Sequence, residues 1–265
     1  MINSPSEVIA ITKEMAKKKY NTPFPKLALL GIFAGFYIGM GGLLSTMAAA
    51  GVNGIAEANP IIPKLLSGAT FPLGLMLVIL VGAELFTGNN AYLIPAAVHG
   101  DIPKSYILKN WGIIFIANFI GAFFFDYIFV YLSGVMKPEV YASYVAHVAE
   151  YKTALPWYQA LIRGIGANWM VCLSVWLALS SRSMVGRVIG LWWPIMGFVV
   201  MGFEHSIANM FYIPTGILHG ANVSWIDFAV KNLLPVTIGN IIGGALFVGS
   251  AYTYLYGKKT ESKTI

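Results

Sequence analysis

Charged residues are scarce in this 265-residue sequence, making up 11% of it against 57% hydrophobic residues. A soluble domain usually carries about 25% charged residues. No charge falls between Lys26 and Glu57 or between Lys231 and Lys258. Uncharged runs of roughly 20 apolar residues are typical of transmembrane helices. The composition therefore excludes a soluble globular domain and indicates an all-α polytopic membrane protein.

Other common features are missing as well. A single cysteine, Cys172, excludes a disulfide framework. The sequence has no phosphate-binding glycine loop, zinc-ligand spacing or nucleophile triad, so we expect no enzyme, no metal and no other cofactor. Paired Asn-Pro-Ala motifs are absent, which argues against a neutral-solute channel of the aquaporin type. The net charge of +6 reflects a skewed distribution of lysines rather than nucleic-acid binding.

Hydropathy predicts six membrane spans. They cover about 27–49, 67–98, 106–133, 157–180, 187–213 and 230–256. The second span is interrupted at Glu84, and the fifth at Glu204 and His205. We expect three parts without a linker domain: an N-terminal segment over 1–26, a membrane domain over 27–257 and a tail over 258–265.

Lysine and arginine are unequally distributed beside the spans, with twelve on the side of the termini and four on the other. The larger group is Lys13, Lys17, Lys18, Lys19, Lys26, Lys104, Lys109, Arg182, Arg187, Lys258, Lys259 and Lys263; the smaller is Lys64, Lys137, Lys152 and Lys231. The positive-inside rule then places both termini in the cytoplasm of a cell-membrane protein. No apolar segment precedes the first span, so we expect no cleavable signal. Residues 6–20 are typical of an amphipathic helix at the inner surface, or of a simple positive anchor.

The two interrupted spans resemble each other. "GAELFTGNNAYLIP" (82–95) and "GFEHSIANMFYIP" (202–214) share Gly-x-Glu, an Asn five residues after the Glu and a Tyr eight after it. "KNWGIIFIANFIG" (109–121) and "KNLLPVTIGNIIG" (231–243) match at nearly the same offset, 122 against 120. Each half, about 27–134 and 157–257, would hold three spans, so the second half enters the membrane upside down. This predicts an inverted repeat whose broken helices line the substrate path.

Glycines recur every four residues in two spans. Gly31, Gly35 and Gly39 lie in the first span, and Gly239 and Gly243 in the sixth. Small residues at this spacing let helix backbones approach closely. The contact is expected either inside one protomer or between subunits.

Glu84 and Glu204 occupy matched positions of the repeat. An ionisable group at membrane depth is costly and suggests a functional site. A structural role is the stronger hypothesis for both, because each carboxylate can accept N–H bonds from backbone freed by the helix break. The half-helices are then expected to begin around Asn89 and Asn209, with the positive ends of their dipoles facing the midplane.

His205 has no counterpart in the first half, where Leu85 takes its place. This asymmetry favours a function over a core histidine that only holds the loop. Histidine titrates near neutrality and both donates and accepts hydrogen bonds, which suits a small weak acid or its anion. It either supplies the proton or only hydrogen-bonds an acid protonated earlier.

A haem-carrying redox subunit is the alternative class. His205 and His219 are 14 residues apart and could place two ligands on one helix. Pro214 interrupts that helix, however, and no other span offers a partner pair of histidines. Visible absorbance of the purified protein would distinguish this alternative.

"GAELFTGN" (82–89), "GFEHSIANMF" (202–211) and "RGIGANWMVCLSVW" (163–176) strongly resemble the formate/nitrite transporter family. The resemblance covers roughly 27–257. It implies an aquaporin-like protomer of six helices in the lipid bilayer, a homopentamer, and one pore per protomer for small monovalent anions of weak acids. Formate is the expected substrate because "GAELFTGN" looks most like the formate branch. Nitrite or hydrosulfide is the alternative.

The same resemblance implies roles for individual residues. The pore centre falls on His205, Thr87 and Asn168; the outer vestibule lysine on Lys152; the apolar constrictions on Phe71, Leu75, Leu85 and Phe198. Lys152 has the alternative of an ordinary solvated loop lysine. Asp126 lies outside the family pattern, and it either caps a helix, snorkels or pairs at an interface.

Overall fold

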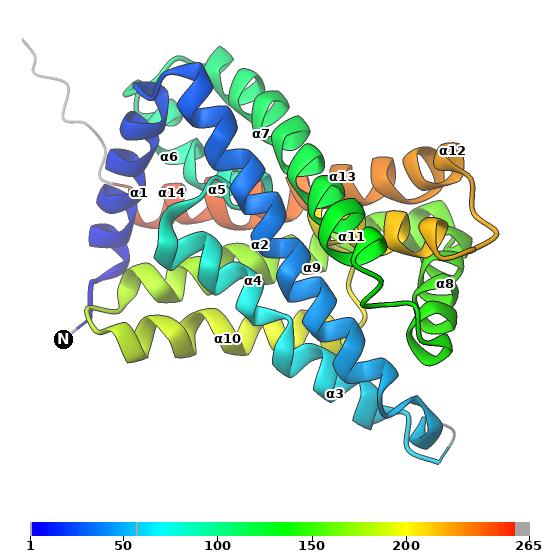
Figure 1. Ribbon diagram of the computed structural model, residues 1–265. Helices are drawn as coiled ribbons and strands as arrows, with labels where there is room; N and C mark the ends of the chain where they lie inside the picture. Colours follow the sequence, from blue (N-terminus) through cyan, green and yellow to red (C-terminus); the bar gives the residue numbers. More distant parts are fainter. Residues whose placement is uncertain (1, 57, 258–265) are drawn as a thin grey trace, which may run out of the picture.

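The computed structural model describes residues 2–56 and 58–257. The expected tail over 258–265, with Lys258, Lys259 and Lys263, lies outside the described residues. Helices account for all the named elements of the described chain, which forms no β-strand (Figure 1). The protein is thus an all-α membrane protein, as the composition predicts.

Four of the six spans are continuous helical stretches. The first is α2 (Phe24–Ala50); the third is α7 (Lys104–Phe125) with η3 (Asp126–Leu132); the fourth is α9 (Trp157–Ser180); the sixth runs from α12 (Trp225–Asp227) through η4 (Phe228–Leu233), α13 (Leu234–Ile241) and η5 (Ile242–Ser250) to α14 (Ala251–Tyr256). Each is long and apolar enough to cross a membrane. Their bounds agree with the expected spans to within about five residues.

The second and fifth spans are broken. The second consists of α3 (Ile61–Thr70), α4 (Pro72–Met76) and η2 (Leu77–Gly82), followed after the break by α5 (Phe86–Tyr92) and α6 (Ile94–Val98); the fifth consists of α10 (Met184–Val200) and, after its break, α11 (Ser206–Leu218). Gly82 ends η2 and Gly202 lies two residues after the end of α10. Their φ angles of 97° and 72° are ones that glycine adopts without a Cβ penalty. The interruptions predicted at Glu84 and at Glu204 are confirmed.

The half-helices begin earlier than expected. They start at Phe86 and Ser206, three residues before Asn89 and Asn209. The first turn of each therefore lies directly beside the interruption, and the two asparagines point back towards it.

Close helix packing occurs inside the protomer. A Cβ on Gly35 would collide with the backbone of Asn118 and Ala122 in α7, and one on Gly239 with the backbone of Leu161 in α9. The first span is therefore pressed against the third, and the sixth against the fourth. The glycine pattern thus reflects packing inside one protomer rather than a subunit interface.

Two helices lie outside the spans, with the short turn η1 (Asn53–Ile55). The first, α1 (Pro5–Tyr20), buries one face, which includes Val8 and Ala16, and lies alongside α6, α9 and α14. The second, α8 (Glu139–Ala154), was not expected from the sequence. It packs on α11 through Val145 and Ala149, at the opposite end of the molecule from α1 (Figure 1).

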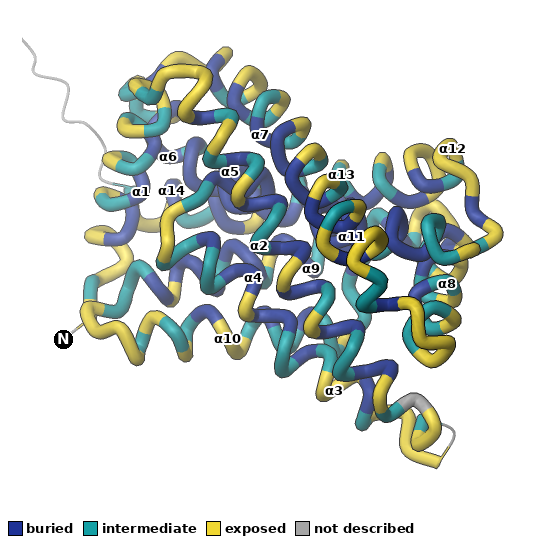
Figure 2. The backbone as a smooth tube through the Cα atoms, in the orientation of Figure 1, coloured by how far each residue is buried: buried dark blue, intermediate teal, exposed yellow. Residues whose placement is uncertain are grey.

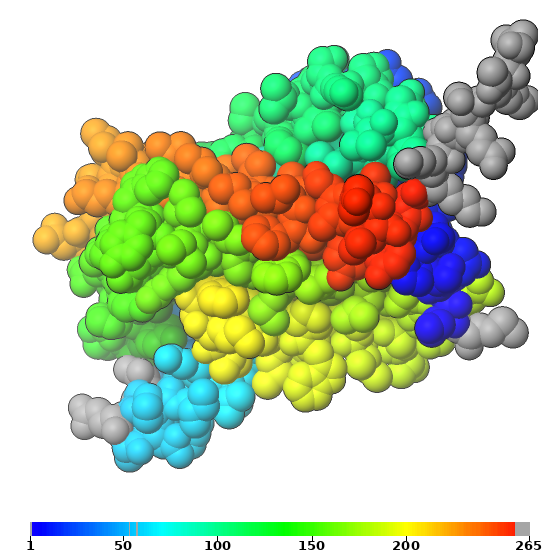
Figure 3. Space-filling view, turned by 180° about the vertical axis from the view of Figure 1, so that it is seen from behind, coloured from blue at the N-terminus to red at the C-terminus, as the bar shows by residue number. Residues whose placement is uncertain are grey.

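Burial follows the pattern of a protein surrounded by an apolar medium. Buried residues line the inward sides of the spans, while exposed and intermediate residues cover the outward sides (Figure 2). Figure 3 shows the sixth span as an orange-to-red band across one face. Exposed side chains on this span include Leu234, Leu246 and Phe247. Apolar surface of this kind suits contact with lipid or with another subunit.

Candidate functional site

The first helix break is held by a charge and amide network around Glu84. Lys19 of α1 places its Nζ 2.6 Å from Glu84 Oε1. Asn89 Nδ2 donates to Glu84 Oε2 at 3.0 Å and also lies 2.9 Å from Asn110 Oδ1. The carboxylate is 11% exposed and its lysine 12%, so this is an almost fully buried ion pair.

The second break repeats the network around Glu204. Lys152 Nζ lies 3.0 Å from Oε1 and 3.1 Å from Oε2. Asn209 Nδ2 donates to Oε2 at 2.7 Å, and Asn232 Nδ2 to the same oxygen at 3.3 Å. Asn209 and Asn232 also contact each other, as Asn89 and Asn110 do. The sequence repeat is therefore a repeat of one ion-pair network.

The expectation that the two carboxylates cap freed backbone N–H groups is wrong. Among the described residues, their partners are lysine and asparagine side chains. Two other asparagines serve the backbone: Asn118 Oδ1 accepts from Phe86 N at 2.9 Å, and Asn240 Oδ1 from Ser206 N at 2.8 Å. The Nδ2 of Asn118 also donates to the backbone carbonyl of Glu84, and that of Asn240 to the backbone carbonyl of Glu204. Asn118 and Asn240 are the matched asparagines of the second sequence repeat, so the signal was present.

His205 lies where the second network meets the space between the half-helices. Its Nε2 is 3.0 Å from Thr87 Oγ1, across 118 residues of sequence. Its Nδ1 accepts the N–H of Ala208 at 3.1 Å, which makes His205 the N-cap of α11. Because Nδ1 uses its lone pair as an acceptor, the hydrogen-bond partners assign the proton to Nε2 of a neutral imidazole. The histidine is only 3% exposed.

Asn168 binds the backbone of Thr87. Its Nδ2 is 3.1 Å from the carbonyl of Thr87, 3.1 Å from Asn90 Oδ1 and 2.6 Å from the carbonyl of Asn240. It is fully buried. Asn168 is therefore placed to fix the backbone that carries Thr87, and among the described residues no hydrogen bond joins its side chain to the imidazole.

A cavity of about 220 Å³ reaches His205 from one side of the molecule. We call it the vestibule; its wall is built by α2, α3, α8, α10 and α11, and includes Ser45, Ser67, Tyr144, Lys152 and Tyr212. It is large enough for a small anion together with several waters. At its inner end Phe71 and Phe198 accompany His205.

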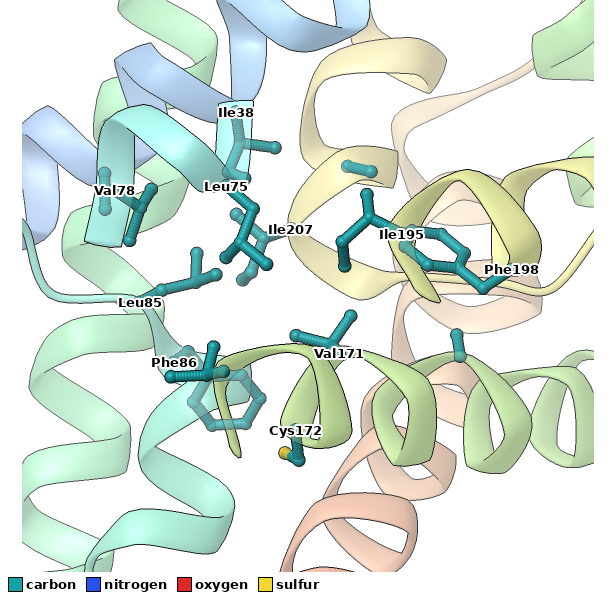
Figure 4. Close-up of a cluster of buried hydrophobic side chains, with 14 of the residues drawn as sticks. Ile38, Leu75, Val78, Leu85, Phe86, Val171, Cys172, Ile195, Phe198 and Ile207 are labelled. Atoms are coloured by element: carbon teal, nitrogen blue, oxygen red, sulfur yellow. The ribbon is translucent and has the colours of Figure 1, made fainter. Parts of the chain in front are cut away.

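Two of the four residues expected at the constrictions, Phe71 and Phe198, line the vestibule together with His205. The rings of Phe71 and Phe198 are 5.9 Å apart in an edge-to-face contact, and Phe198 is also 5.9 Å from the imidazole of His205. Leu75 and Leu85 do not line the vestibule. They belong with both phenylalanines to one buried apolar cluster. Figure 4 shows Leu75, Leu85 and Phe198 in it. A solute leaving the vestibule past His205 therefore meets apolar side chains.

Lys152 is not a solvated loop lysine. It lies on α8, its side chain is 14% exposed, and its Nζ is 5.5 Å from the centre of the Tyr212 ring. It forms an ion pair with the carboxylate of Glu204.

Lys19 is the residue that sequence reasoning missed. It pairs with Glu84 as Lys152 pairs with Glu204. The only sequence signal was its place among the lysines that end α1. Hydropathy carries no information on which lysine of a flanking helix reaches a buried carboxylate.

Two further groups were left open by the sequence. Asp126 is fully buried in span three, with Thr215 Oγ1 of α11 2.8 Å from its Oδ1, so it pairs inside the protomer. His205 and His219 cap opposite ends of α11. A haem site that uses both on one face finds no support, and no group of three His, Cys, Asp or Glu in the described chain could hold a metal.

These features define a multi-pass membrane protein with an inverted repeat and a polar site between two broken helices. The sequence profile described as "Formate/nitrite transporter" matches residues 6–254. A probable formate transporter of Methanothermobacter thermautotrophicus is 38% identical over 270 residues, covering 97% of this chain and 98% of that protein.

Solved structures give the same result. An FNT family ion channel superposes with a TM-score of 0.83 at 28% identity, covering 95% of this chain and 98% of the other. A pentameric formate channel with formate bound superposes with a TM-score of 0.77 at 32% identity, covering 89% and 98%. The chain belongs to the formate/nitrite transporter family, and it is a transporter or channel rather than an enzyme.

Proposed function

We propose that the protein carries formate across the cell membrane by a channel-like, proton-linked route, with one pore in each protomer of a homopentamer. The observation that carries this is the His205–Thr87 pair, 3.0 Å apart, at the inner end of a cavity. The names of a similar transporter and of a similar pentameric channel support formate and the pentamer. The lysine distribution supports cytoplasmic termini. The vestibule would then open on the outer side of the membrane.

The apolar residues set the form in which the substrate crosses. A bare carboxylate that left the vestibule past Phe71 and Phe198 would lose its hydration, which costs several kcal/mol or more. The neutral acid avoids most of this cost. We therefore assign the constriction role to Phe71, Phe198, Leu75 and Leu85.

The cap at Nδ1 favours one of the two proton routes. If His205 gave the Nε2 proton to the anion, it would become an imidazolate unless Nδ1 were protonated. A proton on Nδ1 would face the N–H of Ala208 and break the cap of α11. We infer that protonation occurs in the vestibule, and that His205 donates a hydrogen bond from Nε2 with Thr87 opposite.

The test of the proposed function is uptake into proteoliposomes of formate, nitrite, hydrosulfide and lactate in parallel. We expect formate to enter fastest and its entry to increase as the external pH falls. Faster nitrite or hydrosulfide uptake would replace formate as the substrate. Uptake that does not respond to a proton gradient would remove the proton link.

Leu75→Ala is expected to admit larger acids. Leu75 is 2% exposed beside the path, and removing three carbons from an apolar passage relaxes size discrimination. The ratio of lactate to formate uptake should rise at least about tenfold. Leu191→Ala, at a buried leucine of α10 outside the vestibule wall, controls for general destabilisation. An unchanged ratio in Leu75→Ala would remove Leu75 from the constriction.

A further inference from the structure

The vestibule contains a lysine, Lys64, for which the described residues provide no carboxylate partner. Three of the residues that line it carry a formal charge: Lys64, Lys152 and Glu204. Lys152 contacts both oxygens of Glu204, so these two charges compensate each other. Lys64 is exposed, and among the described residues no carboxylate forms an ion pair with it. The net positive charge of the vestibule wall therefore comes from Lys64.

Lys64 lies on a helix face that leads to the constriction. Ser67 and Phe71 follow it by three and seven residues, and all three line the vestibule. The Cα atoms of Lys64 and Phe71 are thus about 10 Å apart along the axis. Between them Ser67 Oγ is 2.6 Å from Ser45 Oγ, which in turn accepts from Tyr212 Oη at 3.3 Å. An anion moving along this face passes from a cation to hydroxyl groups and then to an aromatic ring.

Two other charged residues, Arg163 and Glu150, are neighbours of vestibule residues in contact or in sequence, but they do not line the cavity themselves. Each binds another group. Arg163 donates to Tyr151 Oη at 3.0 Å. Glu150 accepts the backbone N–H of Asn222 at 3.0 Å. Glu150 forms no ion pair with Lys64 in the described structure, and Arg163 carries the same charge as Lys64.

The position is also asymmetric in the repeat. At the offset of 120 residues that relates Glu84 to Glu204, the counterpart of Lys64 is Met184 at the start of α10. The first half carries a cation where the second carries an apolar side chain. The same kind of difference separates His205 from Leu85.

We propose that Lys64 is the residue that concentrates small monovalent anions in the vestibule, and that Lys152 serves chiefly to hold Glu204. The proposal rests on the proposed function for its substrate class. A lysine in the wall of a cavity attracts anions and so raises their local concentration there. It acts on how often substrate arrives, not on passage past His205.

Lys64→Gln is therefore expected to raise the half-saturation concentration for formate about threefold to tenfold, with the maximal rate unchanged. The difference from wild type should vanish near 1 M salt, where the screening length falls to about 3 Å. Lys137→Gln is the matched control, because Lys137 is an exposed lysine of the same side outside the vestibule wall. Equal half-saturation values in Lys64→Gln and Lys137→Gln would overturn the proposal.

A second measurement reads the charge without transport. Ser67→Cys places a thiol inside the vestibule, while the native Cys172 is fully buried. In this background, Lys64→Gln should lower the ratio of modification rates by anionic and cationic methanethiosulfonates about threefold to tenfold. An unchanged ratio contradicts the role of Lys64 even if formate is carried. A lowered ratio in a protein that carries no formate supports the local charge and refutes the proposed substrate.

Discussion

Replacing His205 by leucine, the residue at the matched position of the first repeat, is expected to reduce formate uptake by about 100-fold or more. The change removes the Nε2 donor that faces Thr87 and the Nδ1 acceptor of the Ala208 N–H. Each buried polar group left without a partner costs about 1–3 kcal/mol. Initial rates of labelled formate uptake, normalised to folded oligomer, measure the effect.

Thr87→Ser is the matched control for this variant, because it keeps a hydroxyl opposite the imidazole. It should retain most of the wild-type uptake. His205→Leu protein that is folded and transports formate at more than about a third of the wild-type rate would contradict the role given to the histidine.

Glu204→Ala is expected to produce the largest loss of stability. It leaves Lys152 without its carboxylate at 14% exposure and removes the acceptor shared by Asn209 and Asn232. Breaking a buried ion pair from one side costs about 3–5 kcal/mol. For a protein of this size the melting temperature should fall by roughly 10 °C, as thermal unfolding in detergent would show.

The repeat supplies an internal comparison for this prediction. Glu84→Ala breaks the equivalent pair with Lys19, and its melting temperature should fall by a similar amount. Removing both partners, in Lys152→Met with Glu204→Gln, should restore part of the loss, since no unpaired charge remains. A wild-type melting temperature for Glu204→Ala would show that the network does not stabilise the break.

Hydropathy and the repeat were sufficient to predict the fold class and the two breaks. Long uncharged runs leave little choice other than helices in a membrane. The Gly-x-Glu motif repeated in two of these runs marks where the helix opens, whereas Asp126, which lacks that motif, lies in a continuous span. The helix α8 was missed because it is short and polar for a membrane protein, although Val145, Ala149 and Thr153 repeat every four residues.

The partners of the buried carboxylates could not be derived in the same way. Lys19 and Glu84 are 65 residues apart, and Lys152 and Glu204 are 52 apart. Such pairings depend on how α1 and α8 pack, which local periodicity does not determine. The capping asparagines, Asn118 and Asn240, were visible as matched positions, but their role requires the geometry of the break.

The most direct test of the central claim, that His205 acts as a neutral donor and helix cap, is a stopped-flow experiment on His205→Asn. Asparagine is a favoured N-cap and can still donate an N–H bond, but it cannot ionise. Labelled formate and an internal pH dye report anion and proton entry together. The account predicts coupled entry within about tenfold of the wild-type rate and with its pH dependence. Formate entry without protons, or a loss as severe as in His205→Leu, would contradict it.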